Sequence, residues 1–337
     1  MTLVSIICPT YNEELYIVKC IESMVSQNID KEGFEVLFVD GGSTDLTVNL
    51  IQKFQQKYNF IKLLNNPDKV VPYAMNIGID KAVGDILIRI DAHSYYPENY
   101  VSVLVSNLIK MNADNVGAIC ITDVLTKNKK TTAIKEVLSN SFGVGNSLFR
   151  LGVSEITEVD TVPFGCYRKE VFTKYGLYNT KLVRNQDIEL NKRIKRGGGK
   201  IYLIPDTYCV YYAREKYREI IKNNYLNGKW SILTVYITKT FNSLSVRHFV
   251  PMLFLLSILF PLLVALVYFP FLYLAIFSIA LYLGLIIIVC SMISINKKIN
   301  FGYLLVTFIL LHFSYGFGSL IGIASIPFQK NKITKHA

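Results

Sequence analysis

Three uncharged apolar blocks near the C-terminal end constrain the fold of this chain more than any other feature. Between Pro251 and Gln329 the only charged residues are Lys297 and Lys298. The blocks cover residues 249–269, 271–295 and 301–326, and a helix of about 20 residues crosses the ~30 Å hydrocarbon core of a bilayer. Core helices of soluble proteins seldom run this long without a charge, so the sequence predicts a transmembrane region at 249–326.

The charges are divided unevenly along the chain. Residues 1–219 hold all 25 acidic residues, whereas residues 220–337 hold nine lysines and arginines and no acid. Anionic lipid headgroups attract basic residues that flank apolar runs. We therefore expect membrane lipid as a partner and no nucleic acid.

The start of the chain has no basic segment before its first apolar run, and it meets acids at Glu13 and Glu14, so no secretory signal is predicted. We expect a cytosolic domain at 1–213, amphipathic interfacial helices at 214–248, the transmembrane region, and a basic tail at 327–337. The expected location is the cell membrane, with several crossings. The six cysteines form no CxxC pair and are expected to be reduced thiols rather than disulfides or zinc ligands.

The third apolar block gives two opposing indications about topology. Its 26 residues, 301–326, are enough for a full crossing. The positive-inside rule instead favours keeping Lys330, Lys332 and Lys335 in the cytosol, which an interfacial or re-entrant block would do. We expect three crossings, with His312 facing protein because an imidazole is costly in lipid.

The first part of the chain alternates apolar runs typical of buried strands with helical segments. Strands are expected at 3–8, 35–40, 60–64 and 85–91, with helices at 12–27, 44–58 and 71–82. Asn12 is expected to cap the first helix. This alternation predicts an α/β fold with a parallel, Rossmann-like sheet, and such sheets bind ligands at the carboxyl ends of their strands.

The pattern is less regular beyond residue 100. Further strands are expected at 116–121, 159–166 and 201–204, with a helix at 186–196 and an amphipathic helical zone at 215–236. The stretch 122–146 is polar and carries Lys127, Lys129 and Lys130, so we expect a solvated loop there.

Two carboxylates follow strands of the predicted sheet. Asp40 closes the second strand before a glycine pair, and Asp91 closes the fourth. Asp91 and His93 alternate along extended backbone, so they face the same way. Carboxylate oxygen and imidazole nitrogen can hold Mn²⁺ or Mg²⁺, the ions that neutralise a leaving diphosphate. One acid could simply begin a turn, but two at one sheet edge favour a shared site.

A second pair of acids begins the predicted helix at 186–196. Asp187 and Glu189 are two residues apart, so they do not share a face. A carboxylate can remove a proton from an attacking hydroxyl as a general base. The alternative is two acids that the helix dipole favours in a first turn.

Four motifs, in order along the chain, carry a resemblance to a known family. They are SIICPTYNEE from Ser5, VDGGSTD from Val39, NPDKVVPYAMNIGIDKAVGDILIRIDAH from Asn66, and FGCYRKEVFTKYGLYNTKLVRNQDIELNKRI from Phe164. Together they resemble family 2 glycosyltransferases of the GT-A fold, and most of all the membrane-bound enzymes of succinoglycan-type exopolysaccharide synthesis. The resemblance implies an inverting, metal-dependent transfer from a nucleotide-sugar donor, UDP-linked, to a saccharide on a polyprenyl-diphosphate carrier at the cytosolic face.

The resemblance also implies roles for particular residues. It places the metal, Mn²⁺ or Mg²⁺, at Asp91 and His93, where the general family has a second Asp and the exopolysaccharide group has His. It makes Asp187 the catalytic base. The residues that it implies as donor contacts are Thr10, Tyr11, Glu13, Asp40, Lys69, Asn76 and Asp91.

The chain departs from the family pattern at two places. Gln186 stands where the family has the Glu of an ED pair, and residues 223–230 lack the QxxRW of processive polymerases. The second departure argues against a polymerase that threads its product. Two alternatives to the transferase remain: a polyprenyl-phosphate sugar synthase, and an inactive membrane scaffold that binds sugar nucleotide.

Overall fold

The computed structural model describes residues 3–333 and divides into two compact units. The first combines Met1–Ile121 with Leu148–Tyr212, and the second combines Thr122–Ser147 with Ala213–Ala337. The chain therefore passes between the units three times, since the segment Thr122–Ser147 leaves the first unit and the chain then returns to it. The last four residues of the predicted basic tail, 334–337, lie outside the described residues.

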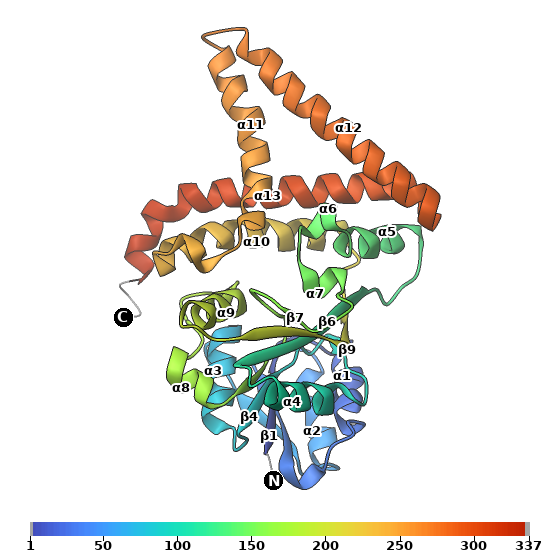
Figure 1. The fold of residues 1–337 in the computed structure, drawn as a ribbon, viewed down its shortest axis with the longest axis vertical. Helices are drawn as coiled ribbons and strands as arrows, with labels where there is room; N and C mark the ends of the chain where they lie inside the picture. Colours follow the sequence, from blue (N-terminus) through green and yellow to red (C-terminus); the bar gives the residue numbers. More distant parts are fainter. Residues whose placement is uncertain (1–2, 334–337) are drawn as a thin grey trace. The chain divides into compact units, whose positions relative to one another are not determined.

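Within the described residues, a sheet of nine strands forms the centre of the first unit (Figure 1). Its order is β3-β2-β1-β4-β8-β6-β9-β5, and β7 pairs with β9. The strands are β1 (Val4–Thr10), β2 (Phe34–Asp40), β3 (Ile61–Asn65), β4 (Ile86–Arg89), β5 (Ser94–Tyr95), β6 (Asn115–Asp123), β7 (Thr157–Glu158), β8 (Cys166–Arg168) and β9 (Ile201–Tyr212).

The predicted parallel arrangement is confirmed for β3, β2, β1 and β4. It does not extend to the rest of the sheet, because β8 pairs antiparallel with both β4 and β6, and β9 pairs antiparallel with β5 and β7. The sheet is therefore mixed. Its parallel half brings the carboxyl ends of β1, β2 and β4 to one edge, and Thr10 lies opposite Asp40 there.

Helices cover both faces of this sheet, because alternate residues of each strand point to opposite sides. Ile6 and Cys8 of β1 belong to one core, with residues of α1 (Ile17–Val25), α2 (Thr47–Gln55) and α4 (Tyr100–Lys110). Ile7 belongs to the other core, with residues of α3 (Val71–Lys81), α8 (Glu170–Tyr175) and α9 (Gln186–Arg196). Two short elements, η1 (Lys31–Gly33) and α7 (Leu148–Leu151), complete this unit.

The predicted cap of the first helix is wrong. Asn12 has a positive φ of 53°, and α1 begins at Ile17 instead. The Asn12 side chain accepts a hydrogen bond from the backbone N–H of Thr44 at 2.8 Å, and its own N–H donates to Ser43 at 2.8 Å. Asn12 therefore ties the loop after β1 to the loop after β2, at the edge where ligands are expected.

The predicted strand at 159–166 is also wrong over most of its length. The chain between β7 and β8 is irregular, and Phe164 has a positive φ of 47°. Asn191 of α9 replaces strand pairing there, since its side-chain amide donates to Thr161 Oγ1 at 2.9 Å and to the carbonyl of Val162 at 3.2 Å. The apolar run is buried by tertiary contacts rather than as a strand.

The second unit contains the stretch 122–146, which is largely helical rather than the expected loop. Its helices are α5 (Lys129–Leu138) and α6 (Ser141–Val144). Asn128 and Thr131 form a capping box at the start of α5. Ala133 and Val137 are buried in a core that includes Phe308 of the last helix, α13 (Phe301–Ile333). The clustered lysines concealed an amphipathic helix whose apolar face needs a distant partner.

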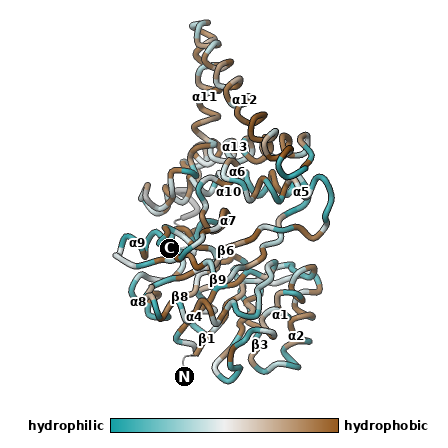
Figure 2. The backbone as a smooth tube through the Cα atoms, turned by 45° about the vertical axis from the view of Figure 1, so that its right-hand side comes forward, coloured by the Kyte–Doolittle hydropathy of each residue, from teal (hydrophilic) through white to brown (hydrophobic). Residues whose placement is uncertain are grey.

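Four longer helices form the remainder of the second unit, and Figure 2 shows hydrophobic colour along much of α11 and α12. These helices are α10 (Tyr217–Thr238), α11 (Val250–Ala265), α12 (Phe271–Lys297) and α13 (Phe301–Ile333), with short turns η2 (Phe241–Ser243) and η3 (Val246–His248) before α11. Among the described residues, Phe271–Lys297 and Phe301–Phe328 are long and apolar enough to cross a membrane, and α11 is a shorter apolar helix.

The prediction that His312 faces protein is confirmed. Its ring nitrogen Nε2 lies 2.9 Å from the carbonyl oxygen of Phe142 in α6, and Nδ1 lies 3.1 Å from the hydroxyl of Tyr282 in α12. Both polar atoms of the ring therefore have partners inside the second unit.

Candidate active site

A pocket lies at the carboxyl edge of the parallel strands, where the sequence predicts the ligand site. The ends of β1 and β4, the loop after β2 and the segment before α3 contribute to it. Its lining includes six of the predicted site residues: Thr10, Tyr11, Glu13, Lys69, Asp91 and His93.

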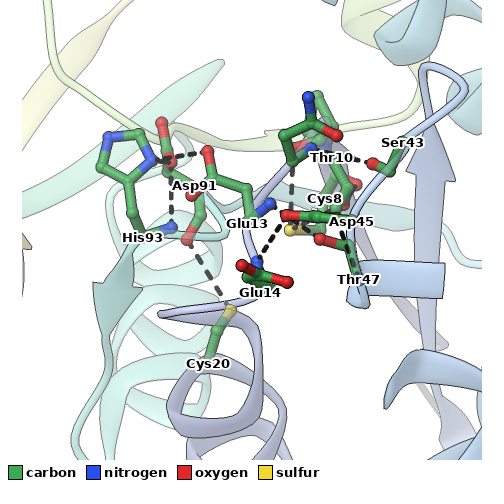
Figure 3. Close-up of polar contacts among 12 residues, drawn as sticks. Cys8, Thr10, Glu13, Glu14, Cys20, Ser43, Asp45, Thr47, Asp91 and His93 are labelled. Atoms are coloured by element: carbon green, nitrogen blue, oxygen red, sulfur yellow. Dashed lines mark hydrogen bonds and ion pairs between the residues drawn. The ribbon is translucent and has the colours of Figure 1, made fainter. Parts of the chain in front are cut away.

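Three of these side chains converge on one another, as Figure 3 shows. His93 Nδ1 lies 2.6 Å from Asp91 Oδ1 and 3.2 Å from Glu13 Oε1. The Asp91 carboxylate also accepts a hydrogen bond from the backbone N–H of His93 at 3.2 Å. All three side chains are largely buried. An imidazole therefore lies between two carboxylates at the end of β4.

Asp91 and His93 each stabilise the charged form of the other. Burial alone would raise the pKa of Asp91, but His93 and Arg89 together outweigh burial and hold that pKa below its usual value. Burial alone would lower the pKa of His93, but Asp91, Tyr211 and Glu13 together outweigh burial and raise that pKa well above its usual value. The two carboxylates therefore favour the protonated form of His93.

The chemistry of this donor set fits a divalent cation. Two carboxylates and one imidazole supply the oxygen and nitrogen ligands that Mn²⁺ and Mg²⁺ accept. His93 Nε2 is buried and has no hydrogen-bond partner among the described residues. In the arrangement described for residues 3–333, no three His, Cys, Asp or Glu residues surround a common point. A metal held here would need an unprotonated His93 nitrogen as its ligand.

The loop after β1 forms another wall of the pocket. Thr10 is buried, and its hydroxyl donates to the carbonyl of Cys8 at 3.0 Å. Tyr11 is half exposed and offers a flat ring at the mouth. A side chain at Gly41 would touch both Tyr11 and the backbone of Lys69, which itself has a positive φ of 62°. The loop after β2 therefore passes within van der Waals distance of the Tyr11 ring and the Lys69 backbone.

Two predicted donor contacts lie outside the lining of this pocket. Asp40 is buried, and its carboxylate accepts hydrogen bonds from the backbone N–H groups of Gly42 and Ser43, each at 2.8 Å, and from the Ser43 hydroxyl. Asn76 exchanges hydrogen bonds with the backbone of Tyr178 at 2.9 and 3.0 Å. In the structure, Asp40 shapes the loop after β2, and Asn76 holds α3 to the segment before α9.

Asp187 is connected to the pocket through a buried arginine. Arg89 of β4 lines the pocket, and its Nη1 lies 3.6 Å from Asp187 Oδ2. Burial alone would lower the pKa of Arg89, but Asp187, together with Asp91 and two neighbouring tyrosines, outweighs burial and raises that pKa, so the guanidinium remains charged. Its Nε and Nη1 have no hydrogen-bond partner among the described residues, so they can bind an oxygen of a ligand.

The acids at the start of α9 have different environments. Asp187 is about one-third exposed, whereas Glu189 is buried and pairs with Arg193 at 2.9 Å. Gln186 is buried, and its Oε1 has no hydrogen-bond partner within the described part of the chain. Glu189 therefore holds the helix and its surroundings together, while Asp187 is the acid that remains accessible.

Two features of the pocket were not predicted from the sequence: the position of Arg89 beside Asp187 and the contact between Glu13 and His93. A signal for Arg89 was present, since a charged residue inside the apolar strand ILIRID, two positions before Asp91, shares a face with that acid. The contact between Glu13 and His93 joins residues 80 positions apart and depends on how the β1 loop folds.

Comparison with known proteins agrees with this architecture. The family model described as glycosyl transferase family 2 matches residues 5–176. A dolichyl N-acetyl-alpha-D-glucosaminyl phosphate 3-beta-D-2,3-diacetamido-2,3-dideoxy-beta-D-glucuronosyltransferase of Methanococcus voltae is 31% identical over 234 residues, which cover 68% of this chain and 72% of that protein. The succinoglycan biosynthesis protein ExoA of Rhizobium meliloti is 31% identical over 214 residues, which cover 63% of each chain.

Solved structures show the same fold. The mannosyltransferase PcManGT from Pyrobaculum calidifontis, in complex with GDP-Man and Mn²⁺, superposes with a TM-score of 0.60 at 14% identity, over 95% of this chain and 87% of that one. The predicted GT-A-like α/β fold is confirmed by these neighbours. The family match and the related sequences together establish that this chain is a glycosyltransferase and belongs to glycosyl transferase family 2.

Proposed function

We propose that this enzyme is an inverting, metal-dependent glycosyltransferase of exopolysaccharide or capsule synthesis. It moves one sugar from a UDP-linked donor to a saccharide on a polyprenyl-diphosphate carrier. The reaction takes place at the cytosolic face of the cell membrane, to which the second unit attaches the enzyme.

The observation that carries this proposal is the link from the pocket to Asp187 through Arg89. Arg89 lines the same pocket as Asp91, His93 and Lys69, and its guanidinium lies 3.6 Å from the Asp187 carboxylate. A group that can accept a proton is thereby held beside a pocket lined by groups that bind phosphate and metal.

The proposed chemistry is a single displacement. Asp187 takes the proton from a hydroxyl of the acceptor sugar while the oxygen of that hydroxyl bonds to the anomeric carbon of the donor. The bond from that carbon to the diphosphate oxygen breaks on the opposite side, so the configuration inverts and UDP leaves. Lys69 and Arg89 offer positive charge to the diphosphate. A divalent cation at Asp91 and His93, with Glu13 close by, would offset the charge of the leaving group.

The related proteins support a lipid-linked acceptor. The Methanococcus voltae relative is named for a dolichyl phosphate that already carries a sugar, and the Rhizobium meliloti relative is named for succinoglycan biosynthesis. An acceptor that already bears a sugar presents a hydroxyl, which requires a base. A polyprenyl phosphate would attack directly through an ionised oxygen and would not need Asp187.

The test is transfer by the purified full chain in detergent or vesicles. Nucleotide sugars are first compared by ligand-induced thermal shift, with and without Mn²⁺. The donor selected in this way is then supplied with polyprenyl-diphosphate saccharides or polyprenyl phosphate, and UDP release and the extracted lipid are analysed. Sugar added to a lipid-linked saccharide supports the proposal. Product formed only on polyprenyl phosphate identifies a polyprenyl-phosphate sugar synthase, and donor binding without UDP release on any acceptor identifies the inactive scaffold.

A further inference from the structure

The third apolar block, now helix α13, runs side by side with the polar helix α10. The hydroxyl of Tyr217 lies 3.3 Å from Thr307 Oγ1 near the start of both helices. Further along, Ser319 Oγ donates to the carbonyl of Gly228 at 3.2 Å. Later residues of α10 thus meet later residues of α13, so the two helices are parallel, as Figure 1 also shows.

Small residues bring these two helices into backbone contact. A Cβ at Gly318 would overlap the carbonyl of Tyr225, and one at Gly228 would overlap the carbonyl of Tyr315. A Cβ at Gly322 would lie 2.8 Å from the carbonyl of Lys229. These contacts extend over a little more than one turn of α10, from Tyr225 to Lys229, and about two turns of α13, and they hold α13 against α10.

Helix α10 is too polar for the hydrocarbon core. It carries Arg218, Glu219, Lys222 and Lys229, and several asparagines accompany them. Each charge at the centre of a bilayer costs several kcal/mol by insertion scales. Because α13 follows α10 along its length, α13 lies at the same depth as a helix that has to remain near water.

The start of α13 is also tied to polar structure. Lys297, at the end of α12, pairs with Glu136 of α5 at 2.7 Å. Three residues then lead to Phe301, where α13 begins. The chain therefore returns from the apolar helix α12 to the polar helix α5 before α13 starts.

Helices α11 and α12 have the opposite character. They form a hairpin that rises from α10 and α13 within the second unit (Figures 1 and 2). Only 11% of the residues in the most apolar window of α12 are buried, against 44% in the corresponding window of α13. From Phe249 to Ser294 the chain has no charged residue. An apolar surface of this extent, bounded by Arg247 and Lys297, fits a phospholipid bilayer.

We infer that the second unit is a one-sided membrane anchor. The hairpin of α11 and α12 enters the bilayer and returns, while α13 lies along α10 at the membrane interface in place of the third crossing expected from its length. Both ends of α13 therefore lie on the side of the membrane that holds α10. The inference rests on the membrane attachment proposed above, but not on the proposed reaction.

A matched pair of tryptophans tests the depth of the two long helices. Trp230 is the only tryptophan of the chain. In a Trp230→Phe background, Leu285→Trp places a probe on the exposed side of α12, and Phe317→Trp places one on the exposed side of α13. The full chain is reconstituted in phosphatidylcholine–phosphatidylglycerol vesicles whose acyl chains carry bromine either near the headgroup or near the bilayer centre.

If the second unit is a one-sided anchor, bromine should quench the fluorescence of the two tryptophans differently. Deep bromines should quench the tryptophan at 285 most, and shallow bromines should quench the tryptophan at 317 most. Equal quenching of both probes by deep bromines would show that α13 crosses and would overturn the inference. Absence of quenching at both positions would overturn the membrane attachment itself, and UDP release by the same preparation would still report the reaction separately.

The side of the membrane is tested with single cysteines after the native cysteines are replaced. Leu15→Cys, on an exposed position of the first unit, marks the side of that unit. Asn331→Cys follows the apolar part of α13. An impermeant thiol reagent should label both cysteines from the same side of sealed vesicles. Labelling of the cysteine at 331 only from the opposite side would overturn the one-sided anchor.

Discussion

The guanidinium of Arg89 lies 3.6 Å from the carboxylate of Asp187, so a strand residue that lines the pocket is paired with the first turn of α9. Arg89 is buried, whereas Asp187 is about one-third exposed. The arginine can therefore hold the orientation of the accessible carboxylate.

Replacement of Asp187 by Asn is expected to lower turnover by about 10²–10⁴-fold, since an amide cannot take the proton of the acceptor hydroxyl. Donor affinity should change little, because Asp187 does not line the donor pocket. UDP release with a lipid-linked saccharide measures the first quantity, and donor titration measures the second. Loss of donor binding in a folded variant would show that the role of Asp187 is misassigned.

Replacement of Arg89 by Met is expected to lower turnover by about 10-fold or more, an amount that corresponds to roughly 1.4 kcal/mol in the barrier. The same change in an Asp187→Asn background should cost much less, since residues that act through one contact are not additive. Arg89→Lys keeps the charge and should retain more activity than Arg89→Met. Equal losses in both backgrounds would mean that Arg89 acts independently of Asp187.

Replacement of Asp91 by Asn is expected to reduce transfer at least 10²-fold and to weaken Mn²⁺ binding, because a neutral amide is a poor ligand for a hard cation. Electron paramagnetic resonance of Mn²⁺ measures the binding, and EDTA treatment of the unmodified enzyme should reproduce the loss of activity. Full activity in EDTA would exclude a metal role for Asp91 and His93.

The buried Glu35 makes the stability of the enzyme sensitive to acid. Burial alone would raise its pKa, but Lys62 at 2.7 Å, Ser5 and the N–H of Val83 outweigh burial and hold the pKa below its usual value. The folded state therefore binds the proton less tightly than the unfolded state. The carboxylate contributes stability at neutral pH, and this contribution is lost as the pH falls below about 4.5 toward the folded pKa.

Glu35→Gln should consequently lower the free energy of unfolding by about 1–3 kcal/mol at pH 7, and by less near pH 4. Thermal unfolding of the full chain, followed by circular dichroism across this pH range, measures the difference. Glu22→Gln, at an exposed position of α1, is the control and should change little. A loss that does not depend on pH would contradict the charge argument.

The glycine contacts of the second unit allow a matched comparison. Gly318→Ala should destabilise the protein by about 1–3 kcal/mol, since the new methyl group would overlap the backbone of Tyr225. Gly284→Ala, in α12, meets nothing within 4 Å and should be neutral or slightly stabilising. Unfolding in detergent compares the two variants. Equal stability would show that α10 and α13 do not depend on this close approach.

Much of the fold follows from local patterns in the sequence. The apolar runs that become β1, β2 and β4 end close to where the structure ends them, and Asp91 and His93 lie at the predicted sheet edge. The stretch 122–146 differs from the prediction because α5 buries Ala133 and Val137 against helices about 150 or more residues away. Arg89 was missed because its importance depends on α9, which comes to it through folding and not through sequence spacing.

The path of the chain between the two units also limits where the protein can be truncated. Because Thr122–Ser147 belongs with the C-terminal helices, a truncation after Tyr212 would remove α10 to α13 but leave α5 and α6 behind. The apolar face of α5 would then be exposed to water, which favours aggregation. A soluble catalytic fragment therefore requires a second cut, with a short linker in place of residues 122–147. For the same reason, exchange of the second unit between relatives would have to transfer two separate segments together.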